Sequence, residues 1–291
     1  MRAPDLDRQA RTYAIWLPTA GVAYDLTPVT QLYASYGRNF IRPYAYLPLV
    51  NTYQSNRAAF RAAGVTLDEL FAGYELEESD TVDLGLRYRG DRFELLPTLF
   101  YGQYRNLLTS VSDPRVLVNG KPLNYQQNIG EATGYGLELT GNVYVSDALD
   151  VFLNATYTRM TYDDNLTYQG AVMATHGKQV VDTPEWMAHA GVRYRWGDVE
   201  WRPRVRYLGK RYGDAQHREA IDDAVIADLT VSYRNTRWWP GTPLTATLEL
   251  TNLFDADYVA TINAADDSQS GNASYYPGAP FAALLTVAIA F

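Results

Sequence analysis

Arginine recurs at every second position in two stretches that alternate with apolar and aromatic residues. The five positions are Arg193, Arg195, Arg202, Arg204 and Arg206. Successive side chains of a β-strand point to opposite faces, so on neighbouring strands these guanidinium groups would form one positive strip. A guanidinium fork binds carboxylates in a bidentate way, so the strip could attract an anionic molecule or pair with acidic groups of another domain. The alternative is an ordinary water-filled interior, balanced by the acidic residues Glu138, Glu200, Asp228 and Glu249.

A second group of cations and aromatic rings falls in long polar stretches of the chain. It comprises Arg42, Tyr44, Tyr46, Tyr53, His217, Arg218, Tyr275 and Tyr276, with His176 and Lys178 in a further stretch. Aromatic faces and cations are suited to holding a bulky, negatively charged molecule. They are therefore candidate ligand-binding residues. For each residue taken alone, the alternative is a solvated loop position.

Residues for catalysis or for direct metal binding are scarce. The sequence has no Cys, and its three His, at positions 176, 189 and 217, share no spacing typical of metal ligands. Neither a G-x-S-x-G motif nor a P-loop occurs. We expect no catalytic residue, no metal site and no cofactor. A hydrolase that uses His217 with the nearby Asp222 and Asp223 is the alternative.

Charge and apolar content exclude two broad classes. The 291 residues include 33 acidic and 25 basic side chains, a formal net charge of −8, which gives no support to nucleic-acid binding. No apolar run approaches the ~20 residues of a membrane-spanning helix. The 24 Tyr residues in a chain with no such helix favour an all-β protein.

Alternation of apolar and polar residues with period two marks about eleven segments, most of them about 9–14 residues long. Crossing a bilayer takes about 9–11 residues in a tilted strand, whereas strands of globular proteins average about 5–6. Short turns alternate with long polar stretches, as in outer-membrane barrels. The turns are expected near 26–28, 90–91, 146–148 and 197–198, with a somewhat longer fifth at 234–243. The loops are expected at 41–77, 110–124, 163–183, 209–223 and 255–276. The sequence therefore predicts an antiparallel transmembrane β-barrel, with Tyr and Trp near the strand ends facing outer-membrane lipid.

The direction of the first strand predicts which part of a barrel this is. A strand at about 13–24 would run into a short turn, which places residues before it outside the cell. Complete bacterial barrels have an even number of strands and both ends in the periplasm. An odd count indicates that residues 1–291 are one domain, the C-terminal portion of a larger barrel. The polar start, residues 1–11, has no apolar signal-peptide core.

Four pieces of sequence resemble the TonB-dependent outer-membrane receptors. Residues 248–258 read LELTNLFDADY, and 276–280 read YPGAP before a final alternating segment that ends on Phe291. Upstream, residues 128–139 read NIGEATGYGLEL and 182–186 read DTPEW. Their order and spacing match the family over nearly the whole chain. One departure is Phe281, which stands where the family commonly has Arg.

The resemblance implies a barrel of about 22 strands with a plugged lumen, in the outer membrane of a Gram-negative bacterium. The plug and the segment that contacts TonB are absent from this sequence, so TonB would act only through that missing part. The last strand resembles the assembly signal read by the barrel-insertion machinery. Its residues are Phe281, Leu285, Val287, Ile289 and Phe291.

The function implied by the resemblance is TonB-dependent uptake of a scarce, bulky ligand, most often a ferric siderophore. The loop residues would then collect a ferric chelate, and the arginine strip would attract it or contact the plug. The same architecture serves vitamin B12, haem, oligosaccharides and other metal chelates, so these residues do not name the ligand. The alternatives are a passive outer-membrane pore and an inert truncated gene product.

Overall fold

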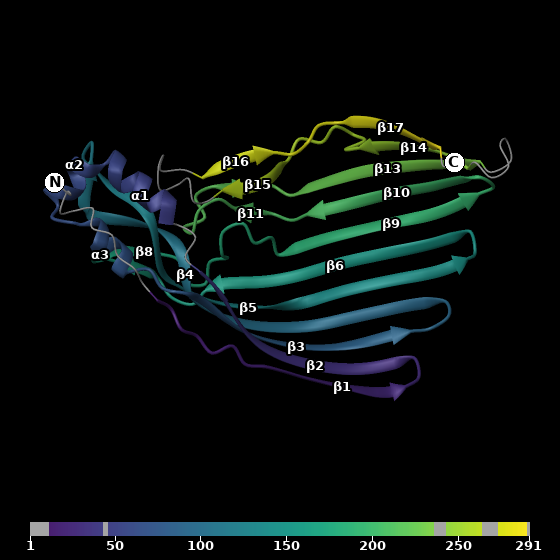
Figure 1. The fold of residues 1–291 in the computed structure, drawn as a ribbon, viewed down its shortest axis with the longest axis horizontal. Coiled ribbons are helices and arrows are strands. Elements are labelled where there is room, and N and C mark those ends of the chain that lie inside the picture. Colours follow the sequence, from purple (N-terminus) through teal and green to yellow (C-terminus); the bar gives the residue numbers. More distant parts are fainter. Residues whose placement is uncertain (1–11, 43–45, 236–242, 264–272, 290–291) are drawn as a thin grey trace.

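The computed structural model describes residues 12–42, 46–235, 243–263 and 273–289. Within these ranges the main element is one antiparallel sheet of eleven strands (Figure 1). In spatial order the strands are β1 (Thr19–Thr27), β2 (Thr30–Ile41), β3 (Glu77–Arg89), β4 (Phe93–Val118), β5 (Lys121–Ser146), β6 (Leu149–Tyr162), β9 (Trp186–Trp196), β10 (Val199–Leu208), β13 (Ala224–Asn235), β14 (Leu244–Thr251) and β17 (Ala282–Ile289). The all-β antiparallel class and the number of about eleven strands are confirmed. In the described part the sheet is open, with β1 and β17 at its edges.

The remaining elements lie at one end of the sheet, opposite the short turns (Figure 1). They are the helices α1 (Tyr46–Ser55), α2 (Arg57–Ala62) and α3 (Leu67–Ala72), and the paired strands β7 (Leu166–Tyr168) with β8 (Ala171–Met173), β11 (Arg211–Tyr212) with β12 (Ala220–Ile221), and β15 (Val259–Asn263) with β16 (Ser274–Pro277). Among the residues described, no helix has the length and apolar content needed to cross a membrane. The short turns expected at the other end join β1 to β2, β3 to β4, β5 to β6, and β9 to β10. Most of the fifth expected turn, residues 236–242, lies outside the described residues.

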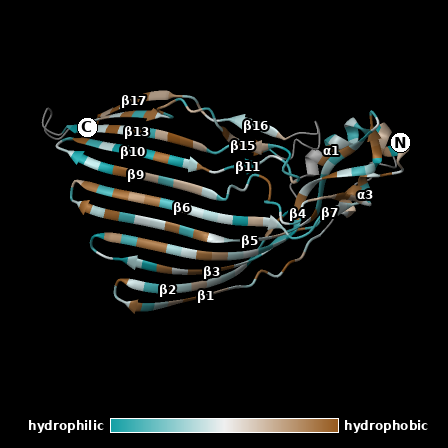
Figure 2. Ribbon diagram, turned by 180° about the vertical axis from the view of Figure 1, so that it is seen from behind, coloured by the Kyte–Doolittle hydropathy of each residue, from teal (hydrophilic) through white to brown (hydrophobic). Residues whose placement is uncertain are grey.

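The strand alternation gives the sheet one apolar and one polar face. On the apolar face Leu84, Leu99 and Leu137 are cross-strand neighbours, and they are 55%, 56% and 39% exposed. Figure 2 shows hydrophobic and hydrophilic residues alternating along the strands. A continuous apolar surface of this kind is unfavourable in water but matches the lipid-facing band of a membrane barrel.

The strands β4 and β5 are 26 residues long and continue well beyond the sheet. Their neighbours stop earlier, because β3 pairs with β4 only as far as Arg105 and β6 pairs with β5 only from Ala132. The outer part, residues 107–118 and 121–130, is called the arm below. Its tip is an Asn119-Gly120 turn with φ of 52° and 76°, the left-handed conformation that two-residue hairpins require. The prediction of a polar loop at 110–124 is therefore wrong, because the pairing of β4 with β5 continues through these residues.

The expected polar loop at 41–77 is also wrong, because it contains α1, α2 and α3. Helix α3 begins after Thr66, whose hydroxyl accepts a hydrogen bond from the backbone N–H of Glu69 at 3.1 Å and so caps the helix. Helices of 6 to 10 residues are unstable alone in water. These three are held by packing against the arm, and helices and arm together are called the cap. Its buried core comprises Leu49, Tyr53, Phe60, Val65, Leu67, Leu70, Tyr74, Val111, Val116, Leu123 and Tyr125.

The Asn-Leu-Phe-Asp sequence at 252–255 fastens the last strand of the sheet. Asn252 is 2% exposed with φ of 48°, and its amide group donates to the carbonyls of Ala256 and Ala279 at 2.9 and 3.0 Å. Its side-chain oxygen accepts from the N–H of Ala256, and the Asp255 carboxylate accepts from the N–H of Phe281. These bonds tie the end of β14 to the residues that lead into β17.

We expect Asn252→Ala to lower the free energy of unfolding by about 2 kcal/mol, because it removes three hydrogen bonds and Ala tolerates positive φ poorly. Thermal unfolding in detergent micelles, followed by circular dichroism, measures the change. Asn119→Ala is the matched control, since Asn119 also has a positive φ of 52° but lies exposed at the tip of the arm. Unchanged melting temperatures for the Ala variant would show that this motif does not hold β17.

Candidate functional site

The arginine strip forms on the polar face of the sheet, as predicted. β9 and β10 pair directly, with Arg195 opposite Glu200 and Arg204 opposite Gly191. Four of the five guanidinium groups have a carboxylate partner on the same face. The ion pairs are Arg193–Asp150 at 2.5 Å, Arg195–Glu200 at 2.8 Å, Arg206–Asp228 at 3.3 Å, and Arg202–Glu200.

The charge of the strip is therefore largely compensated within the sheet. Five guanidinium groups against the carboxylates of Asp150, Glu200 and Asp228 leave a local charge of +2. Arg204 makes no ion pair with the described residues, and its buried Nε has no hydrogen-bond partner among them. Of the five, Arg204 is thus the one best placed to meet a charge from outside this sheet. Contact of the strip with a ligand or a plug stays a prediction.

The loop residues predicted to bind a ligand fall in different environments. Arg42 is exposed directly after β2, whereas Tyr44 and the side chain of Tyr46 lie outside the described residues. Tyr53 is 0% exposed: its ring stacks on Phe60 at 4.7 Å and its hydroxyl donates to the carbonyl of Val65. A ligand cannot reach Tyr53 while the cap core is intact, so this side chain has a structural role.

The predicted ligand-binding residues at 217–218 and at 275–276 come close together in the fold. Tyr275 donates from its hydroxyl to the Glu219 carboxylate, which joins the β15–β16 hairpin to the β11–β12 segment. Next to Glu219, the Arg218 side chain is 66% exposed and ion-paired with Asp214 at 3.2 Å. His217 has φ of 60°, and its ring lies parallel to that of Tyr212 at 3.6 Å. Tyr276 is exposed, so Arg218, Tyr275 and Tyr276 are all accessible near one another in the fold.

A cavity of about 250 Å³ lies beside Arg218, where four segments meet. It is lined by the start of β3, the base of the arm, the β6–β9 loop and the β11–β12 segment. Its polar side chains are Glu77, Thr109, Ser110, Gln126, Tyr162, Asp182, Asp214, Gln216 and Arg218. Among them, only Arg218 is a ligand-binding residue predicted from the sequence. The Asp214 carboxylate accepts hydrogen bonds from the backbone N–H groups of Gln216 and Glu219. Asp commonly forms such a turn with the residues that follow it, so the sequence could have indicated this one.

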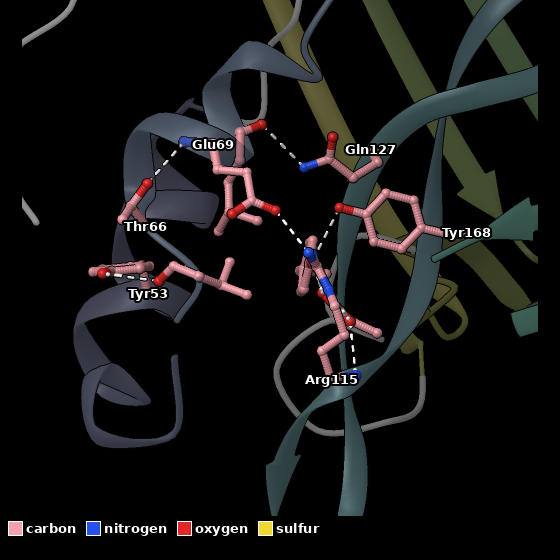
Figure 3. A network of polar contacts seen from close by, with 10 residues as sticks. Tyr53, Thr66, Glu69, Arg115, Gln127 and Tyr168 are labelled. Atoms are coloured by element: carbon pink, nitrogen blue, oxygen red, sulfur yellow. Dashed lines mark hydrogen bonds and ion pairs between the residues drawn. The ribbon is translucent and has the colours of Figure 1, made fainter. Parts of the chain in front are cut away.

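A charged network lies inside the cap, outside the membrane-spanning part of the sheet (Figure 3). The fully buried Asp113 accepts hydrogen bonds from Arg115 and from the Tyr125 hydroxyl at 2.5 Å. Arg115 also pairs with Glu69 at 2.7 Å, and Gln127 donates to the carbonyl of Leu70, so both residues tie the arm to α3. Burial alone would raise the pKa of the Asp113 carboxyl, but the Arg115 and Tyr125 hydrogen bonds outweigh it and hold this pKa below its usual range.

The predicted assembly residues lie in or beside β17. Leu285, Val287 and Ile289 occupy alternate positions and are 65%, 58% and 49% exposed. Phe281 directly precedes the strand, and Phe291 lies outside the described residues. Across the described ranges, no three His, Asp or Glu side chains are grouped so that they could hold a metal ion.

Comparison with known proteins gives a family match over most of the chain. Residues 2–253 match the family model "TonB dependent receptor-like, beta-barrel". An uncharacterized TonB-dependent receptor of Haemophilus influenzae is 26% identical over 198 residues, which cover 65% of this chain and 54% of that protein. The ferrioxamine receptor of Yersinia enterocolitica is 25% identical over 159 residues, 54% of this chain and 22% of that protein.

Solved structures share the fold. The ferric preacinetobactin receptor of Acinetobacter baumannii superposes with a TM-score of 0.64 at 18% identity, covering 94% of this chain and 36% of that one. The chain thus spans about half or less of the length of the curated relatives it matches and about a third of this structure.

Proposed function

The chain belongs to the TonB-dependent receptor β-barrel family, an outer-membrane family of Gram-negative transport receptors and not of enzymes, and from this premise we propose that it supplies the C-terminal strands of a ferric siderophore receptor. The observation that carries the proposal is the eleven-stranded antiparallel sheet with a continuous apolar face, within a chain matched by the family model over residues 2–253. TonB would act on this receptor through a plug segment outside residues 1–291.

The open edges of the sheet support the larger barrel. Among the described residues β1 and β17 each pair on one side only. Hydrocarbon cannot satisfy the backbone groups of an open edge, so a membrane-embedded sheet needs further strands between β17 and β1. A barrel of about 22 strands would provide them. The exposed alternation of Leu285, Val287 and Ile289 on β17 fits recognition by the barrel-insertion machinery.

Iron chelates are the substrate class that the relatives favour. One is named a receptor for ferrioxamine and another a receptor for ferric preacinetobactin, and both names denote siderophores. Accessible Arg218, Tyr275 and Tyr276 at the loop end of the sheet offer a cation and aromatic faces to such a ligand.

Uptake of radioactive iron tests the proposal. We expect cells that carry the receptor in its native genomic form to accumulate iron supplied as a ferric siderophore, and to lose this accumulation when TonB is deleted. Ferrioxamine B and a catecholate chelate are the first ligands to compare. Iron entry that persists without TonB, together with conductance steps in a planar bilayer, would instead favour the passive pore. Absence of the chain from the outer membrane would favour an inert product.

A further inference from the structure

We propose that the cavity beside Arg218 is a subsite for a positively charged, amine-bearing arm of the transported ligand. The proposal rests on the proposed siderophore function for its biological meaning, but the cavity itself is defined by residues of this chain alone. Its volume of about 250 Å³ is below the range of about 300–1,000 Å³ that holds a whole drug-sized ligand. It therefore has room for one arm of a bulky chelate.

The charges around the cavity leave one carboxylate uncompensated. Asp182 is paired with Arg211 at 2.8 Å, and Asp214 is paired with Arg218 at 3.2 Å. Glu77 accepts one hydrogen bond, from the backbone N–H of Leu108 at 2.8 Å, and no cation of the described residues lies within ion-pair distance of it. A half-buried carboxylate is stabilised by a cation that donates hydrogen bonds to it.

A second polar group in the cavity also lacks a partner. The Ser110 Oγ is buried and makes no hydrogen bond within the described part of the chain. An unsatisfied buried hydroxyl is costly, and Ser110 therefore adds to the polar character of this wall. An ammonium group carries three donors, of which the Glu77 carboxylate can accept more than one.

Part of the wall is apolar. Leu107, Leu108, Met173, Val180 and Val181 line the cavity and are each half-buried. Methylene groups of an alkyl chain would gain from burial against these side chains. A carboxylate or phenolate arm would instead meet Glu77. The cavity is thus matched to an alkylammonium group and not to the anionic part of a ferric chelate.

The test uses the receptor in its native genomic form, in detergent micelles, with its methionine methyl groups isotopically labelled for NMR. Met173 lines the cavity, whereas Met160 and Met187 lie on β6 and β9 and serve as internal reporters of the sheet. We expect n-butylammonium to shift the Met173 signal alone, and 1-butanol of equal chain length to bind at least about tenfold more weakly.

Glu77→Gln should weaken n-butylammonium binding by about tenfold or more, while its amide oxygen keeps the acceptor for the Leu108 N–H. Glu131→Gln removes the same charge from an exposed position outside the cavity and should have no effect. Unchanged Met160 and Met187 signals verify that the variants fold. The proposal is overturned if n-butylammonium leaves Met173 unchanged, if 1-butanol binds equally well, or if Glu77→Gln binds like the native chain.

A receptor-level experiment separates this inference from the proposed function. Ferrioxamine B ends in an ammonium group, and its N-acetyl derivative is neutral there. Preference of the native receptor for the ammonium form, lost in Glu77→Gln, supports the subsite. Equal uptake of both forms overturns the subsite but leaves siderophore transport standing. Selective binding of n-butylammonium at Met173 without uptake of any ferric chelate would support the subsite and overturn siderophore transport.

Discussion

Phe60→Ala should loosen the cap while leaving the sheet intact, at a cost of about 3–5 kcal/mol in local stability. Phe60 is 0% exposed and its ring lies 4.7 Å from that of Tyr53 and 5.9 Å from that of Tyr125. Truncation leaves a cavity between α2 and the arm that short helices cannot close without losing other contacts. The loss should be local, because the cap has a core of its own beyond the last shared strand pairs of the sheet.

Hydrogen exchange read out by mass spectrometry measures this effect. Exchange should accelerate in peptides from α1 to α3 and from the arm, and stay slow in β6 and β13. Phe254→Ala removes the same atoms from a side chain that is 78% exposed and should change little. Uniform acceleration across the sheet would contradict an independent cap core.

Asp113→Asn should destabilise the same region by about 3 kcal/mol and remove part of its acid sensitivity. The substitution removes the charge that accepts hydrogen bonds from Arg115 and Tyr125 inside the cap. Because the pKa of Asp113 is lower in the folded state than in the unfolded chain, ionisation of Asp113 favours the folded cap at neutral pH. This contribution is full above the unfolded pKa of about 3.9 and is lost as the pH falls through the lower folded value.

The methyl signal of Met173, which packs against the cap core, reports this transition between pH 7 and pH 2. The native Met173 signal should disappear at acid pH in the wild-type chain. In the Asn variant this signal should be weaker at pH 7, but its intensity should depend less on pH below 4. Asp68→Asn is the control, because Asp68 lies exposed in the first turn of α3 and outside the network. A variant as stable as wild type at pH 7 would show that Asp113 does not hold the cap.

The network has a consequence for the loop end as a whole. Asp113, Arg115 and Glu69 connect the arm to α3, and Met173 of β8 touches both the cap core and the cavity. The cavity wall is therefore continuous with the packed cap. Loss of the cap should also lower n-butylammonium affinity at Met173, even though neither Phe60 nor Asp113 lines the cavity.

The membrane-spanning sheet could be derived from the sequence, because alternation with period two is a local property. Alternation alone places Leu84 and Leu137 on the apolar faces of their strands, and the register sets both beside Leu99. The arginine strip followed from the same alternation. Glu200 and Asp228 were also expected from the sequence as balancing charges, and both pair with the strip. The Asp150 partner of Arg193 was not expected, because it reaches that residue only through the pairing of β6 with β9.

Sequence alone thus determined the strands, their two faces, the short turns and the family of this protein, since each is encoded in neighbouring residues. Only the tertiary structure decided the cap, the burial of Tyr53 and the cavity at Glu77 and Ser110. Helices of 6 to 10 residues carry too little information and too little stability of their own to be predicted apart from the arm that buries them. The cavity is formed by segments more than 100 residues apart, from Glu77 to Arg218, so no local sequence pattern predicts it.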